Sequence, residues 1–129
     1  MSSRVKPHLL IVAHGSRRQA SNLEIQQLAD RLSLNQTEFA TITCGFLELA
    51  EPSIPDALRR LIAQEAQSIV VMPYFLSAGR HVSEDIPAEI AAVAAEFQTV
   101  KIVLADYLGS ASGIRDLLFS QAIKSIEQQ

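Results

Sequence analysis

Short apolar runs alternate along this chain with longer segments of helical period. Four runs are almost continuously apolar: HLLIVAHG, FATITCGFLE, SIVVMPYFL and VKIVLADYLG. A strand covered on both faces needs apolar side chains at nearly every position, whereas a half-covered strand alternates apolar and polar residues. The four runs therefore favour the strands of a parallel sheet.

The segments between and after these runs have the spacing of amphipathic helices. Behind the first run, Ser21 and Glu24 form a capping-box pattern, and Ile25, Leu28 and Leu32 share one helical face. Behind the second run, Ser53 and Asp56 bracket the start of a helix. Its apolar positions, and those of the two later helices, are Ile54, Ala57, Leu58, Leu61 and Ile62, then Ile86, Ile90, Val93, Ala94 and Phe97, then Ile114, Leu117, Leu118 and Ala122.

The resulting order is βαβαβαβα. It predicts an α/β fold in which a four-stranded parallel sheet carries helices on both faces, because right-handed crossovers place them there. The 129 residues suit one domain, so we expect residues 1–129 to form a single unit. Four strands are few for such a fold, so one sheet edge is expected to be exposed or covered by a partner.

Composition narrows the class of protein. The formal charge is −3, which disfavours a nucleic-acid partner, and 48% of the residues are hydrophobic, which permits a full core. The apolar stretch before His14 is too short to span a membrane and has no signal-peptide pattern, so we expect no membrane partner. The one cysteine, Cys44, cannot form an internal disulfide. A cytoplasmic location is the simplest expectation.

Polar side chains collect where the predicted strands end. Ligands of open α/β sheets bind outside the carboxyl ends of the strands. His14 ends the first run, Glu48 ends the second and His81 follows the third, and we expect them on one rim of the sheet. Candidate substrate-binding residues on the same rim are Ser16, Arg17, Arg18, Ser77, Arg80 and Ser83.

This set of groups suits metal handling and proton transfer. Two imidazoles and a carboxylate bind borderline divalent ions such as Co²⁺, Fe²⁺, Ni²⁺ or Zn²⁺ and leave open coordination positions. The same groups also accept protons. Neutral imidazole is needed for either role, so activity is expected to fall below about pH 6.5. No nucleotide-binding glycine motif is present.

Other interpretations stay open on the residues alone. A histidine at a strand end is often only a hydrogen-bonded structural residue, which is our interpretation of His8. The same site also fits a carrier of Co²⁺ or Ni²⁺ that catalyses nothing. A flavodoxin-like signalling module is disfavoured, because the first run ends in HGSR and lacks the acidic cluster that holds Mg²⁺.

The stretches LLIVAHGSR, GFLELAEPSI and IVVMPYFLSAGRHVSEDIP together resemble the short-form sirohydrochlorin chelatases, the CbiX/SirB type of class II tetrapyrrole chelatase. The resemblance runs from about Leu9 to Leu118. It implies insertion of Co²⁺ or Fe²⁺ into sirohydrochlorin without ATP, toward cobalamin or siroheme, with no permanently bound cofactor. Longer relatives contain two such modules, so the short form implies a homodimer. The alternative function is a carrier of Co²⁺, Ni²⁺ or the tetrapyrrole that catalyses nothing.

The resemblance also assigns roles to residues. His14 and His81 match the metal-handling histidines, and Glu48 matches an acidic position close to the site. The FLSAGRHV loop matches the stretch that lies against the macrocycle. Sirohydrochlorin carries many carboxylates, for which arginines at the mouth would be partners. Relatives often carry Leu-Gly-x-His-Pro where this chain has YLGSASG, so the loop after the fourth run contributes no histidine.

Overall fold

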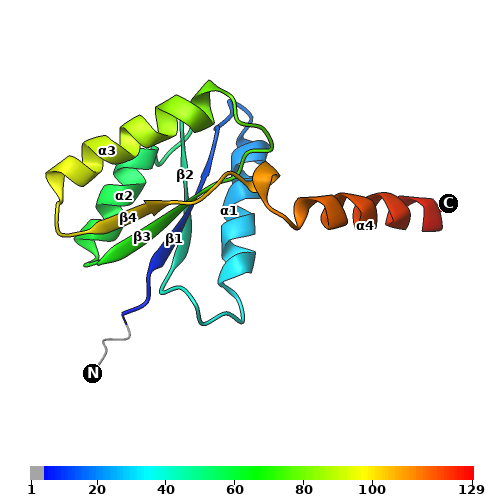
Figure 1. Cartoon of the computed structure of the whole chain (residues 1–129), viewed down its shortest axis with the longest axis horizontal. Helices are drawn as coiled ribbons and strands as arrows, with labels where there is room; N and C mark the ends of the chain where they lie inside the picture. Colours follow the sequence, from blue (N-terminus) through cyan, green and yellow to red (C-terminus); the bar gives the residue numbers. More distant parts are fainter. Residues whose placement is uncertain (1–4) are drawn as a thin grey trace.

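A parallel sheet forms the centre of the molecule (Figure 1). The computed structural model describes residues 5–129. The strands stand in the order β2-β1-β3-β4 and every neighbouring pair is parallel, as the sequence predicts. Their bounds are β1 His8–Ala13, β2 Ile42–Phe46, β3 Ser68–Pro73 and β4 Lys101–Leu104.

Four α-helices follow the strands in turn. They are α1 Gln19–Ser33, α2 Ile54–Ala63, α3 Ile86–Glu96 and α4 Ile114–Glu127. Two shorter helical segments lie in the loops after β3 and β4, namely η1 His81–Asp85, which is a π-helix, and η2 Leu108–Ser110, a 3₁₀ turn. Among residues 5–129, no helix combines the length and apolarity needed to cross a bilayer.

One face of the sheet is covered by α2 and α3 over its two central strands, β1 and β3. Alternate residues of β1 and β3 point to this face, including Leu10, Val12, Ile69 and Val71, and all four are buried against the two helices. The apolar stripe predicted for α2 is the main reason, since it buries Ile54, Ala57, Leu58 and Leu61. The Oγ of Ser53 accepts a hydrogen bond from the backbone N–H of Asp56 at 3.2 Å, which confirms the predicted cap.

Among the described helices, α1 alone covers the opposite face. Ile11, Ala13 and Cys44 are buried there against the α1 residue Ala29, over the β1–β2 half of the sheet. The apolar positions predicted for the fourth helix, Leu117 and Leu118 among them, do not pack on the sheet, because α4 extends away from it and both side chains are exposed (Figure 1). The expectation that the helices cover the sheet is therefore wrong for α4.

The predicted start of the first helix also needs correction. The helix begins at Gln19, and its N-cap is Arg18 with no side-chain cap bond, so Ser21 lies within the first turn. The preceding loop fixes this earlier start, because the Oγ of Ser16 accepts a hydrogen bond from the N–H of Arg18 at 3.0 Å. Leu32 is exposed as well, and Ala29 takes the buried position on that turn.

Candidate metal and proton-transfer site

In an open sheet of this strand order, the loops after β1 and β3 diverge and leave a crevice above the centre of the sheet. The chain leaves β1 toward β2 on one side and returns to β3 on the other, so the ends of β1 and β3 form the switch point where ligands bind in such sheets. His14, Glu48 and His81 meet there, and one ligand atom from each lies within 4.8 Å of the others. These are the three residues that the sequence places at the centre of the site.

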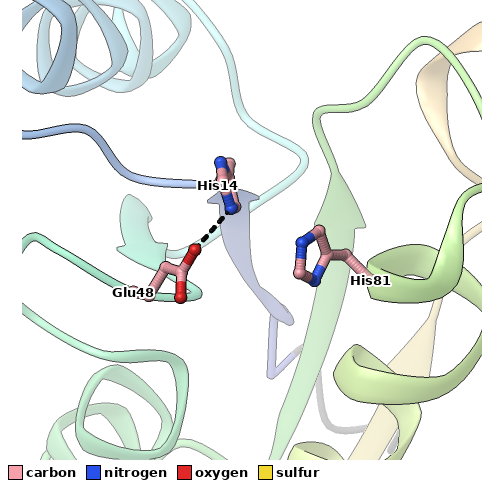
Figure 2. A group of neighbouring side chains, drawn as sticks. All are labelled: His14, Glu48 and His81. Atoms are coloured by element: carbon pink, nitrogen blue, oxygen red, sulfur yellow. Dashed lines mark ion pairs between the residues drawn. The ribbon is translucent and has the colours of Figure 1, made fainter.

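His14 and Glu48 form a direct pair although 33 residues separate them along the chain. His14 Nε2 lies 2.7 Å from Glu48 Oε2, and the two side chains are 47% and 51% exposed (Figure 2). Two backbone hydrogen bonds join the loops that carry them: Leu47 N–H donates to the Ala13 carbonyl at 2.9 Å, and Glu48 N–H donates to the His14 carbonyl at 3.0 Å. The pairing of β1 with β2 therefore continues for two residues beyond the strands and carries the pair.

Gly15 makes this close approach possible. Its φ of +95° lies in the region that residues with a side chain rarely adopt. A Cβ at this position would lie 1.8 Å from the carbonyl oxygen of Glu48. Only glycine therefore lets the loop after β1 pass against the backbone of Glu48.

A buried amide holds the same loop from the other side. Asn22, in the first turn of α1, is only 3% exposed and is the one buried polar residue in the described chain. Its Oδ1 accepts from the N–H of Ser16 at 2.9 Å, while its Nδ2 donates to the Ser16 carbonyl at 2.8 Å. This two-point clamp on Ser16 fixes the path of the backbone two residues beyond His14.

His81 is oriented by a carboxylate of its own. Its Nδ1 lies 2.8 Å from Asp85 Oδ2, four residues along η1. The wider π-turn is closed by the N–H of Ile86, which donates to the carbonyl of His81 five residues back. If Nδ1–H donates to Asp85, Nε2 keeps its lone pair for a metal ion or a proton.

The two imidazoles face one another across the crevice. Their ring centroids are 4.8 Å apart and the rings are tilted by 33°. Figure 2 shows His14 above Glu48 on one side of the crevice, with His81 entering from the helical segment on the other. Each imidazole thus has its own carboxylate, and we call these the His14–Glu48 pair and the His81–Asp85 pair.

Asp85 and Asn22 belong to the site although the sequence pattern does not assign them to it. For Asp85 there was a signal, since His and Asp four residues apart in HVSED share one side of a helical turn. Asn22 had no such signal, because a polar residue near a helix start is usually a solvated position or a cap. Its burial depends on how the loop from 14 to 18 folds back.

The expected substrate-binding residues lie around the rim of the sheet, and they differ in how far local hydrogen bonds already hold them. Arg17, Arg18, Ser77 and Arg80 have exposed side chains, which leaves them accessible to a ligand above the crevice. Two serines are engaged in local structure. Ser16 is held by Asn22 and Arg18, and the Oγ of Ser83 donates to the carbonyl of Gly79 at 3.1 Å.

A cavity of about 390 Å³ opens beside His14, on the face of the sheet that carries α1. Its walls include Ile25, Leu28 and Arg31 from α1 and Tyr74 from the end of β3. Polar side chains such as Ser21 and Glu24 line it together with these apolar ones. It forms a recess next to the imidazole.

The donor set suits loose binding of a divalent ion. Nitrogen and oxygen ligands of a tetrahedral ion stand about 3.4 Å from one another, given bonds of about 2.1 Å. The three ligand atoms here spread over as much as 4.8 Å, so the side chains must close in to hold one ion together. With no thiolate among them, the ligands favour an ion that is bound and then released.

Two titratable groups near the sheet lie outside this cluster. Burial raises the pKa of the Cys44 thiol, and Asp30 adds to the effect, so this cysteine is a core residue with little thiolate character. Burial also raises the pKa of Glu89 in α3, with a further contribution from the charge of Asp85. Glu89 Oε1 is buried and has no hydrogen-bond partner within the described residues.

Comparison with known proteins finds sirohydrochlorin chelatases among the proteins similar to this chain. The chain is 36% identical over 110 residues to the chloroplastic sirohydrochlorin ferrochelatase of Arabidopsis thaliana, covering 85% of this chain and 48% of that protein. It is 31% identical over 118 residues to a sirohydrochlorin cobaltochelatase of Sulfolobus acidocaldarius, covering 92% and 91%. The chain therefore spans about half the length of the plant relative and nearly all of the archaeal one.

A solved structure has the same fold over its full length. The CbiX protein of cobalamin (vitamin B12) biosynthesis from Marinobacter aquaeolei superposes with a TM-score of 0.81 at 29% identity, covering 95% of this chain and 100% of that one. The model of the CbiX family matches residues 8–125, which include both imidazole–carboxylate pairs. The chain belongs to the CbiX family.

Proposed function

We propose that this protein inserts Co²⁺ or Fe²⁺ into sirohydrochlorin, with the metal ion as a substrate. The observation that carries the proposal is the convergence of His14, Glu48 and His81 on one open crevice. The names of the plant and archaeal relatives supply the macrocycle and the two metals. Ni²⁺ has similar ligand preferences and is a further metal to test.

The reaction has a simple proton balance that the two pairs can meet. The macrocycle loses two pyrrole protons while four ring nitrogens take up M²⁺, so one metallated ring and two protons are formed, with no change of oxidation state. In our proposal the His14–Glu48 pair and the His81–Asp85 pair each accept one proton. In each pair the carboxylate then stabilises the imidazolium that forms.

Metal delivery follows from the same geometry. Without metal, the short contact between His14 Nε2 and Glu48 Oε2 requires a proton between the two atoms. An ion that enters there must displace this proton, so metal binding competes with protons. A competing proton keeps the ion loosely held, which favours its transfer to the macrocycle nitrogens.

The rim residues provide charge for substrate binding. Arg17, Arg18 and Arg80 have exposed guanidinium groups on the loops that border the crevice. We assign them to the carboxylates of sirohydrochlorin, for which forked guanidinium donors are well shaped. Ser16, Ser77 and Ser83 belong to the same loops and complete the proposed substrate-binding surface.

We further propose that residues 1–129 act as one module and work as a homodimer in the cytoplasm. The plant relative is about twice the length that this chain covers, so two copies would match it in size. The single buried, unpaired Cys44 suits a reducing compartment.

An absorbance time course tests the reaction. Purified protein is mixed under anaerobic conditions with excess sirohydrochlorin, and Co²⁺, Fe²⁺ or Ni²⁺ is added separately. We expect the macrocycle spectrum to change much faster than without protein and to continue past one equivalent per chain. A change that stops at one equivalent would instead identify a carrier, and an unchanged spectrum would exclude sirohydrochlorin as the substrate.

A further inference from the structure

Strand β2 forms one edge of the sheet, with β1 as its one neighbour among the described strands. Before β2, the Leu9 N–H donates to the Thr41 carbonyl at 2.9 Å. Beyond β2, the Leu47 N–H donates to the Ala13 carbonyl, also at 2.9 Å. Because the direction of the backbone groups alternates along a strand, these bonds orient the odd-numbered residues of this segment toward β1. The even-numbered residues therefore direct their N–H and carbonyl groups to the open edge.

The chain itself covers this edge at the carboxyl end of β2 and leaves it open below. The Phe46 N–H donates to the Pro52 carbonyl at 2.8 Å, and Phe46 forms an isolated parallel bridge with Ser53. The next outward residue is Cys44, and among residues 5–129 no hydrogen bond from outside the sheet reaches its N–H or its carbonyl. Cys44 is only 9% exposed, and a buried backbone group without a partner costs free energy. A ligand beside Cys44 that offers one acceptor and one donor would satisfy both groups.

A cavity of about 350 Å³ lies beside this part of the edge, between α1 and α2. The small side chains of Ala29 and Ala57 line it and leave room between the two helices. Two opposite charges also line it, Asp30 from α1 and Arg60 from α2, and both side chains are exposed. Within the described residues, neither of them belongs to an ion pair. The cavity thus combines an open backbone edge with one free charge of each sign.

We propose that this edge cavity binds a free α-amino acid with an apolar side chain. One α-amino acid carries an acceptor and a donor on either side of its Cα, which is how a residue of an added strand bonds both backbone groups of its partner. In the bound zwitterion the carboxylate accepts from the Cys44 N–H and from Arg60, while the ammonium group donates to the Cys44 carbonyl and to Asp30. Each end of the ligand's main chain therefore meets one backbone group and one charge.

The remaining walls of the cavity favour an aliphatic side chain on the ligand. Leu61 and Ile42 line the cavity together with the two alanines, and an aliphatic group would be buried against them. Gln26 and Gln64 also line it and are exposed, so they can keep their bonds to water. At sheet edges that bind peptides, main-chain bonds supply affinity and side-chain pockets supply specificity. Leucine, valine and methionine are the candidate ligands.

This cavity is separate from the crevice, although β2 borders both. Strand β2 ends at Phe46, and Glu48 follows two residues later in the metal-binding cluster. Among the described residues, none that lines the edge cavity belongs to the cluster or to the recess beside His14. Binding of an amino acid can therefore be measured on metal-free protein without sirohydrochlorin.

The first test is an NMR titration of the isotope-labelled, metal-free protein with L-leucine, L-valine and L-methionine in turn. We expect at least one of them to shift the amide resonance of Cys44 saturably, with a Kd below about 1 mM, as a ligand of this size allows. Its N-acetyl derivative lacks the ammonium group and its amide derivative lacks the carboxylate, so each should bind at least about tenfold more weakly. Absence of a saturable Cys44 shift with all three amino acids would overturn the proposal.

The second test removes the two charges beside the edge. Asp30→Asn and Arg60→Gln should each weaken binding of the same amino acid at least about tenfold. Glu38→Gln and Lys101→Gln are the matched controls, because each removes one exposed charge of the same sign outside this cavity. All four positions are exposed, so we expect the circular dichroism of every variant to match wild type. Unchanged binding in both Asp30→Asn and Arg60→Gln would also overturn the proposal.

A neutral compound separates a free amino acid from a peptide strand as the occupant. N-acetyl-L-leucine N-methylamide keeps both main-chain bonds and carries no charge. If it binds as tightly as the amino acid, the occupant is an extended peptide segment and a free amino acid is excluded. None of these results depends on metal insertion. A protein that binds an amino acid here and fails to metallate sirohydrochlorin would lose the proposed function and keep this site.

Discussion

The two imidazole–carboxylate pairs reach the same crevice by different routes. The His81–Asp85 pair is local, because four residues of one helical turn place both groups together. The His14–Glu48 pair is built by tertiary structure, from loops at the ends of two strands. Half of the site therefore depends on short-range sequence and half on the sheet. The two halves should therefore respond differently to substitution.

Of the substitutions considered, one that disturbs the His14–Glu48 pair should reduce turnover most. Gly15→Ala places a methyl group where the Glu48 carbonyl lies and disfavours the φ of +95°. We expect turnover to fall at least about a hundredfold, and the free energy of unfolding to fall by about 2–4 kcal/mol. Steady-state absorbance assays and urea unfolding measure the two quantities. Gly113→Ala is the control, since its Cβ would meet nothing within 4 Å and Gly113 precedes α4, outside the proposed substrate-binding loops. Equal activity of the two variants would show that the close approach is unimportant.

Removal of either imidazole should cause the second largest loss of turnover. His14→Ala and His81→Ala should each lower turnover by about tenfold to a hundredfold if each side chain accepts a proton. The control is His8→Ala, because His8 lies at the opposite end of β1 and bonds the Thr41 hydroxyl at 2.7 Å. Near-normal turnover in both site variants would exclude the proposed chemistry.

The carboxylates allow the two pairs to be compared directly. Glu48→Gln removes a metal ligand, so we expect the KM for Co²⁺ to rise about tenfold. Asp85→Asn leaves the three-residue cluster intact and weakens only the orientation of His81, so we expect kcat to fall by a few-fold to about tenfold with little change in that KM. If the two variants have the same kinetic pattern, the division of roles between the pairs is wrong.

The smallest effect is expected on the free energy of unfolding, through Glu89 near the His81–Asp85 pair. Because burial raises the pKa of Glu89, the folded chain keeps this proton to a higher pH than the unfolded chain does. The associated stability is present below the unfolded pKa and is lost as pH rises through the folded one. Glu89→Gln should thus match wild type near pH 4 and exceed it by about 0.5–1 kcal/mol at pH 7, a range kept low because the side chain is only half-buried.

Urea unfolding at several pH values measures this difference. The control is Glu38→Gln, whose carboxylate is exposed. A Glu89→Gln advantage that does not change with pH would show that the effect does not come from the ionised carboxylate.

The covered parts of the fold are the parts that the sequence predicts. The α2 stripe from Ile54 to Leu61 follows the helical period and packs as expected, because its whole apolar face meets its own sheet. Helix α4 is about as apolar, but its apolar side chains are spread around the helix, and that pattern does not say what covers them. The sequence therefore predicted the helical character of α4 correctly and its packing on the sheet wrongly.

The site, too, has residues that the sequence places correctly and one that it could not place. His14, Glu48 and His81 could be placed on one rim because parallel strands all end at the same edge. Asn22 could not be placed, since its function depends on the folded path of the loop at Ser16. The predicted cap at Ser21 failed for a related reason. Local capping rules describe an isolated helix end, whereas this one starts inside a loop that Asn22 holds in place.

The π-turn of η1 allows the chain to hold one more residue between β3 and α3 than an α-turn would. Losing a single residue from 82–84 would therefore restore ordinary helix geometry. An α-turn with one residue fewer covers nearly the same rotation, so the loop before η1 would keep its direction relative to α3. His81 and the carboxylate of Asp85 would then stand three residues apart and not four, which changes the contact that orients the imidazole. In this segment the number of residues thus determines how His81 is held, even when no residue of the cluster is substituted.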